Sequence, residues 1–88
     1  MSSAEVAAKV VRDLEPEEFK VLNVLASSLK DTESLTVDHI SSKTKLHKDK
    51  ARFSIGKLNQ MELVISTNRG VSLVSAGLDA LALKILAD

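Results

Sequence analysis

The chain contains no cysteine, tryptophan or tyrosine, and only two phenylalanines, three glycines and one proline among 88 residues. The lack of cysteine excludes disulfides, thiolate metal ligands and cysteine nucleophiles, and it argues against a secreted domain framed by disulfides. Because aromatic side chains are so few, the core must be built from leucine, valine, isoleucine and alanine. This composition favours packed helices.

Motifs of known enzymes are also missing. The three glycines are far apart and form neither a phosphate-binding loop nor a dinucleotide fingerprint. His47-Lys48-Asp49 superficially resembles the catalytic triplet of protein kinases, but Ser54 occupies the position where that motif carries asparagine. His39 and His47 have no cysteine or paired carboxylates at metal-ligand spacing. We therefore expect no catalytic, metal or cofactor site in this chain.

The length is enough for one domain over 1–88 but too small for a core and a separate catalytic cleft. The first residues lack the basic segment and apolar stretch of a signal peptide, and no run of about 18 apolar residues could span a bilayer. We expect a soluble, cytoplasmic protein with no membrane contact.

The spacing of apolar residues predicts helices in the first third of the chain. An N-terminal helix is predicted over 1–14. A second helix begins at Pro16, whose fixed φ suits a first helical position, and ends near Lys30. Its predicted buried stripe consists of Phe19, Leu22, Leu25, Ala26 and Leu29. Negative charge suits the start of this helix and is supplied by Glu15, Glu17 and Glu18.

A helix-turn-helix is predicted over 36–61, with Thr36 as N-cap and Leu46 turned inward. Two β-branched runs in 63–74 form a hairpin, or wing, joined by the three-residue connection Asn68-Arg69-Gly70. The fold class is mainly α with a small β-hairpin: a winged helix-turn-helix with an extra N-terminal helix.

The last helix is predicted over 75–87. Its expected stripe is Leu78, Leu81, Ala82 and Ile85. Leu83 and Leu86 extend the apolar surface around most of the helix, so we expect neighbours on two sides.

The formal net charge is zero, but positive charge is concentrated in one segment. Residues 43–57 carry six basic side chains against the single acid Asp49, a local charge of +5. Residues 1–42 carry eight acidic and four basic side chains. Clustered lysine and arginine neutralise phosphates and release counterions, so this segment is the predicted nucleic-acid-binding element.

In helical projection, the second helix of the helix-turn-helix has an inner face of Ala51, Ile55 and Leu58. The outward residues include three that can reach base edges or phosphates and five that can position the backbone. These predicted contacts are Arg52, Asn59 and Gln60, then Lys45, Lys48, Lys50, Lys57 and Arg69. Gly56 would allow close approach. The alternative interpretation is a solvated face or a protein-docking surface.

Phe53 also points outward in this projection. It could stack on an unpaired base, or it could pack against the preceding helix or a neighbouring domain. We expect packing.

Three segments resemble one family: Leu14 to Leu22, Lys50-Ala51-Arg52 with Ile55 and Leu58 behind it, and above all Ala76 to Lys84. Together they are similar to the N-terminal winged-helix domain of Rio-type atypical serine/threonine protein kinases of the second subfamily, over roughly residues 14 to 87. In that family a kinase domain follows, and the protein takes part in maturation of the small ribosomal subunit.

The resemblance implies a non-catalytic, monomeric module that binds ribosomal RNA of the small-subunit precursor. ATP and magnesium would belong to the kinase domain, which would also cover the apolar surplus of the last helix. Two rivals stay open. One is a stand-alone winged-helix transcription regulator that binds DNA as a dimer, and the other is a module whose charged helix docks a protein.

Overall fold

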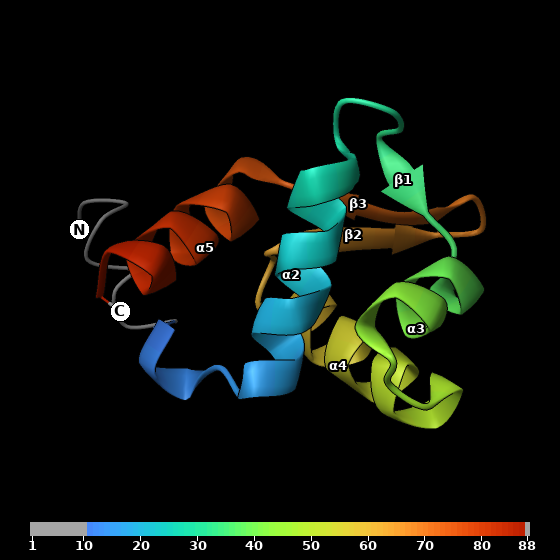
Figure 1. Cartoon of the computed structure of the whole chain (residues 1–88), viewed down its shortest axis with the longest axis horizontal. Helices are drawn as coiled ribbons and strands as arrows, with labels where there is room; N and C mark the ends of the chain where they lie inside the picture. Colours follow the sequence, from blue (N-terminus) through green and yellow to red (C-terminus); the bar gives the residue numbers. More distant parts are fainter. Residues whose placement is uncertain (1–10, 88) are drawn as a thin grey trace.

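The structure is a computed structural model that describes residues 11–87. Its elements, in chain order, are α2 (Pro16–Ser28), β1 (Ser34–Leu35), α3 (Val37–Thr44), α4 (Lys48–Gln60), β2 (Val64–Thr67), β3 (Gly70–Leu73) and α5 (Ser75–Ala87). Helix α2 lies at the centre, with α5 on one side and α3, α4 and the sheet on the other (Figure 1). The helix predicted over 1–14 lies mostly outside the described residues, of which 11–13 are helical.

The predicted fold class is confirmed: α3, a turn and α4 form the helix-turn-helix, and β2 and β3 form the wing. The sheet nevertheless has a third strand that the sequence analysis missed. Ser34 pairs with Ser72 and Leu35 with Val71, so the strand order is β1-β3-β2. A strand of two residues is too short to show the alternation by which strands are recognised.

The wing turn is tighter than predicted. Thr67 pairs directly with Gly70, which leaves two connecting residues, Asn68 and Arg69, rather than three. Gly70 has a φ of 138°, a conformation that favours glycine. A Cβ there would also lie 2.8 Å from the carbonyl oxygen of Leu35. The missing side chain thus allows both the turn and the approach of β1.

The core is aliphatic, as the composition predicts. The predicted stripe of α2 is confirmed at Leu22 and Leu25, which are buried, but Val21 is fully buried as well, and Leu29, beyond the helix end, is exposed. In α5 the buried positions are Gly77, Ala80 and Leu81, whereas Leu78 and Ile85 are exposed. A helix that is apolar nearly all round does not reveal which face will be covered.

Gly77 determines which face of α5 is buried. A Cβ at this position would collide with the carbonyl oxygen of Leu63 and would lie 2.6 Å from Cδ1 of Leu73. Only glycine allows the backbone of α5 to lie this close to the chain that enters β2.

Glu18 and Lys57 join the start of α2 to α4. The Glu18 side chain, only 4% exposed, accepts a hydrogen bond from the Glu15 backbone N–H at 3.1 Å. Its Oε1 also lies 2.8 Å from Nζ of Lys57, and that ammonium donates to the carbonyl oxygen of Asp13 at 3.1 Å. Glu18 is therefore more than a charge at a helix start, because it fixes the position of α4 against α2.

Replacing Lys57 with methionine should lower the midpoint of thermal unfolding, because the buried Glu18 carboxylate loses its ionic partner. Lys20→Met, at an exposed position of α2, is the control and should change the midpoint little. The double variant Glu18→Gln/Lys57→Met should lose less stability than the two single changes added together. Strict additivity would contradict a direct interaction.

The same pair predicts a pH dependence. The hydrogen bond to Glu18 raises the pKa of Lys57 above the ordinary value. The stability that this ion pair gives the fold is therefore complete below about pH 10.4, the pKa of a lysine in the unfolded chain. It is lost as the pH rises through the higher pKa of Lys57 in the folded state. The stability difference between wild type and Lys57→Met should shrink in that alkaline range.

Candidate nucleic-acid interface

The turn between α3 and α4 is held by hydroxyl groups. Thr44 Oγ1 donates to the carbonyl oxygen of Ile40 at 2.7 Å and accepts from the Leu46 backbone N–H at 3.3 Å. Ser41 Oγ donates to the carbonyl oxygen of Leu46. Lys45 ends α3 in the left-handed conformation, with a φ of 62°. These bonds set the direction in which α4 leaves the turn.

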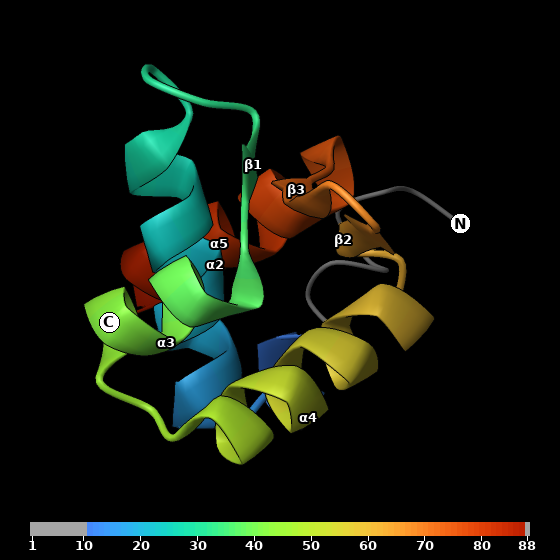
Figure 2. The same cartoon turned by 90° about the vertical axis from the view of Figure 1, so that its right-hand side faces the viewer.

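Helix α4 is divided sharply between core and solvent. Its buried residues are Ala51, Ser54, Ile55 and Leu58. On the opposite side lies the outer face of α4, formed by the exposed residues Asp49, Arg52, Phe53, Gly56 and Gln60. Figure 2 shows the helix along one edge of the molecule, with α2 and α3 on its inner side. The outer face is thus open to a ligand along the whole helix.

The cations around this face have weak partners. Lys48 lies 3.2 Å from Asp38, and Arg52 lies 3.9 Å from Asp49, with all four side chains more than half exposed. Exposed pairs of this kind contribute little stability, so a phosphate can replace the carboxylate at small cost. Lys48, Arg52 and the exposed Lys45 and Lys50 can therefore turn to an anionic ligand.

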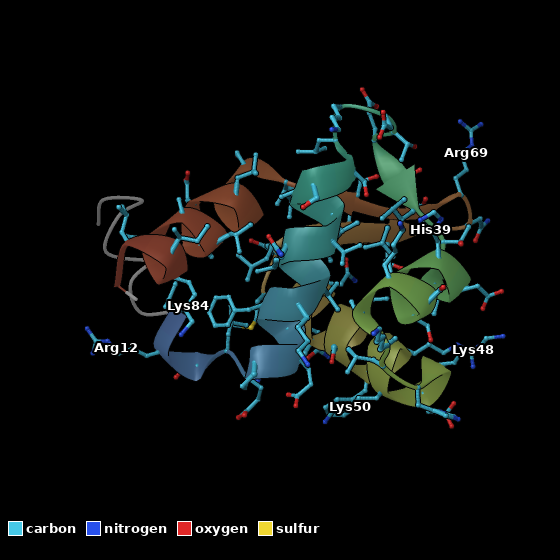
Figure 3. All side chains as sticks on the ribbon, viewed as in Figure 1. Arg12, His39, Lys48, Lys50, Arg69 and Lys84 are labelled. Atoms are coloured by element: carbon cyan, nitrogen blue, oxygen red, sulfur yellow. The ribbon has the colours of Figure 1, made fainter. Side chains whose placement is uncertain are left out.

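Arg69 occupies the tip of the wing rather than the outer face of α4. Figure 3 places Arg69 and Lys48 at the end of the molecule opposite Arg12 and Lys84. The wing could therefore contact a ligand beyond the helix.

Two of the predicted contacts have structural roles. Lys57 is held by Glu18 and the Asp13 carbonyl oxygen. Asn59 Oδ1 accepts a hydrogen bond from the Ser66 backbone N–H at 3.3 Å, which joins α4 to β2. Both residues position the interface, whereas Gln60 is exposed beside Gly56 and can meet a ligand.

The expectation that Phe53 packs is wrong as regards the preceding helix α3, because its side chain is 71% exposed. Packing against a neighbouring domain stays a prediction. The inner face of α4 is already filled by aliphatic residues, and Phe53 lies on the other side of the helix. A shallow groove runs beside its ring, lined by Arg52, Phe53, Gly56, Lys57 and Gln60.

Gly56 is not required by packing. A Cβ added there would meet no atom within 4 Å, because it would point into the open groove. Glycine inside a helix costs about 1 kcal/mol relative to alanine. The chain therefore loses stability here with no gain inside the fold.

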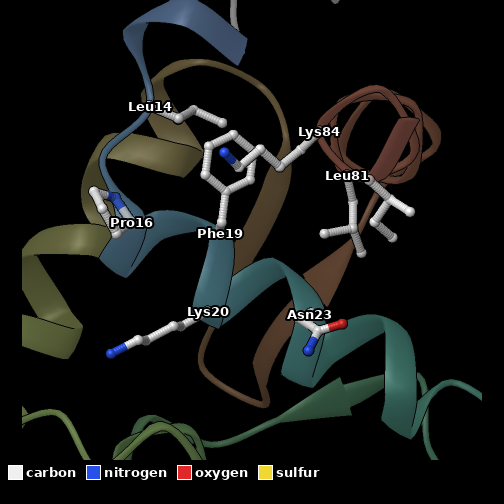
Figure 4. Close-up of a pocket in the computed structure, with 8 residues that line it drawn as sticks. Leu14, Pro16, Phe19, Lys20, Asn23, Leu81 and Lys84 are labelled. Atoms are coloured by element: carbon white, nitrogen blue, oxygen red, sulfur yellow. The ribbon is translucent and has the colours of Figure 1, made fainter. Parts of the chain in front are cut away.

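A second hollow lies between α2 and α5, on the other side of the molecule (Figure 4). Its wall is mostly apolar and includes Leu14, Pro16, Phe19 and Leu81. The ammonium of Lys84 lies 5.4 Å from the centre of the Phe19 ring. The described residues that line this hollow include two lysines but no carboxylate, histidine or hydroxyl group.

Among the described residues, neither the glycines nor the metal-ligating side chains come together in one place. Gly56, Gly70 and Gly77 lie on three separate elements, and residues 11–87 bring together no group of three metal-ligating side chains. His39 and His47 are both exposed. Within the same range no helix is both long and apolar enough to cross a membrane.

A helix-turn-helix followed by a hairpin, with the second helix open to solvent, defines a winged-helix domain. The chain belongs to the family described as Rio2, N-terminal, whose family model matches residues 11–88. This is the non-catalytic domain at the N-terminus of Rio2-type kinases. A comparison with individually curated proteins gave no significant match.

The two helical glycines predict opposite effects of one substitution. Gly56→Ala should raise the free energy of unfolding by about 0.5–1 kcal/mol, because the methyl group enters open space. Gly77→Ala should lower it by about 1–3 kcal/mol, because the methyl group collides with the Leu63 backbone. Urea unfolding of the two variants measures both effects, and equal signs would contradict the packing described.

Proposed function

We propose that this domain binds nucleic acid through the outer face of α4 and the wing tip, and that it directs a Rio2-type serine/threonine kinase to ribosomal RNA of the maturing small subunit. The observation that supports this most strongly is that Lys48, Lys50 and Arg52 of α4 are exposed and that the ion pairs of Lys48 and Arg52 lie at the surface. Family membership supports the link to a Rio2-type kinase. The role in ribosome maturation and a cytoplasmic location are part of this proposal.

The contacts divide into two groups. Lys45, Lys48, Lys50 and Arg69 would neutralise phosphates, because their charges are exposed and free to move with the ligand backbone. Arg52 and Gln60, on either side of Gly56, would reach base edges or sugar groups. Lys57 and Asn59 keep α4 and the wing in place through their bonds to Asp13, Glu18 and Ser66, so their main role would be to hold the interface in shape.

We propose in addition that the kinase domain of the parent protein covers part of α5. Ile85 and Leu86 are 65% and 81% exposed, a large apolar exposure for the end of one helix. ATP and magnesium would bind in that kinase domain, and the present domain would take no part in phosphoryl transfer.

The same exposed residues could instead form a dimer, as expected for a stand-alone transcription regulator. Sedimentation distinguishes the two, because a kinase module should stay monomeric on its own. A dimer that dissociates when Ile85 and Leu86 are replaced by serine would favour the regulator.

Salt dependence tests nucleic-acid binding directly. The logarithm of the association constant for single-stranded RNA should fall linearly with the logarithm of salt concentration. In Lys48→Gln/Lys50→Gln, which removes two of the proposed phosphate contacts, the slope should be shallower by about 1.4, since each lost phosphate contact removes about 0.7 on a single strand.

The matched control is Lys20→Gln/Lys30→Gln, which removes the same charge from exposed positions away from α4. It should retain the wild-type slope. Wild-type protein that binds neither RNA nor DNA at low salt would contradict the proposal. Equal slopes for the two double variants would exclude the outer face of α4 and favour its use as a protein-docking surface.

A further inference from the structure

Phe53 is the one large apolar side chain of α4 that is exposed. Its neighbours on the helix surface, three and four residues away, include no apolar side chain: they are Asp49, Lys50, Gly56 and Lys57. The Lys50 ammonium lies 5.9 Å from the centre of the ring. An aromatic ring is therefore presented to solvent in the middle of the cationic face.

The groove beside the ring is lined by Arg52, Phe53, Gly56, Lys57 and Gln60, and a Cβ added at Gly56 would meet no atom within 4 Å. The space above the glycine is therefore open. Neither the exposed ring nor the helical glycine stabilises the fold. Both become useful if a planar ligand lies against the ring above Gly56.

We infer that Phe53 stacks on an unpaired base, so that the preferred ligand is single-stranded or looped RNA rather than a continuous duplex. The inference rests on the proposed function. In a duplex the faces of the bases are covered by their neighbours and only their edges are accessible in the grooves. An unpaired base exposes its face, and proteins bind such bases by stacking them on aromatic side chains.

Charge favours nucleic acid over a protein partner at this position. The centres of protein interfaces are depleted in charged residues, whereas the Phe53 ring has the Lys50 ammonium beside it and shares a groove with Arg52 and Lys57. Asp49 is the one acid of α4, and it is paired with Arg52. A nucleotide suits both the ring and the cations, because its base covers the ring and its phosphate meets the positive charge. A peptide with one apolar side chain would cover the ring but would add no negative charge beside the cations.

The first test compares an oligouridylate with an RNA duplex of equal length. Phe53→Leu keeps an apolar side chain but removes the aromatic face, and it should weaken oligouridylate binding by roughly 5- to 150-fold, the range measured for one stacked base. Phe53→Tyr should bind like wild type. Duplex binding, which rests on the phosphate contacts, should change much less in either variant.

The second test uses fluorescence, since the natural chain contains no tryptophan or tyrosine. In Phe53→Trp the single indole should be quenched by the oligouridylate and not by the duplex. Leu86→Trp, on the exposed end of α5, is the matched control and should be quenched by neither. Unfolding curves check that each variant folds. We expect both to fold, because Phe53 and Leu86 are exposed and an indole there displaces no core side chain.

The outcomes separate this inference from the proposed function. If wild type binds no nucleic acid, the proposed function fails and the inference fails with it. If wild type binds with the expected salt slope but Phe53→Leu binds the oligouridylate equally well, only the stacking is overturned. Equal losses on the oligouridylate and the duplex, or equal quenching by both, would also overturn it.

Discussion

The ion pair between Glu18 and Lys57 is the contact on which the position of the charged helix depends. Glu18 is buried at the first turn of α2, where it also bonds the Glu15 backbone, and Lys57 belongs to the last turns of α4. One carboxylate therefore closes a helix start and fixes a second helix against it. Because the inner face of α4 is held by this ion pair and by the core, the helix does not depend on its exposed side chains for its position. Lys48, Lys50 and Arg52 can therefore take part in the proposed binding.

Helix α4 has opposite faces for packing and for the proposed binding of nucleic acid. Ala51, Ile55 and Leu58 belong to the core, while the other face combines weakly paired cations with an exposed aromatic ring and a helical glycine. The exposed ion pairs contribute little stability, and the mid-helix glycine costs stability that alanine would retain. Because these features lie together on one face and do not stabilise the fold, they support the proposal that this face binds a ligand.

Sequence reasoning could predict the helix-turn-helix, the wing and the inner face of α4, because capping residues, turn residues and amphipathic spacing are local signals. It could not predict strand β1, whose two residues form a strand only beside Val71 and Ser72. The buried face of α5 depends on the contact between Gly77 and Leu63, and the role of Lys57 depends on a carboxylate 39 positions earlier in the chain. One signal for that pair was present in the sequence. Glu18 lies at helical spacing from Val21, Leu22 and Leu25, on the face of α2 that the structure buries.

The central claim is that the outer face of α4 contacts nucleic acid. NMR mapping of amide chemical shifts during titration with single-stranded RNA tests it most directly, because it needs no substitution. The account predicts the largest shifts at Arg52, Phe53, Gly56 and Gln60, smaller shifts at the wing tip around Arg69, and none along α5. Shifts confined to α5 and the hollow beside Phe19, or no shifts at low salt, would contradict it.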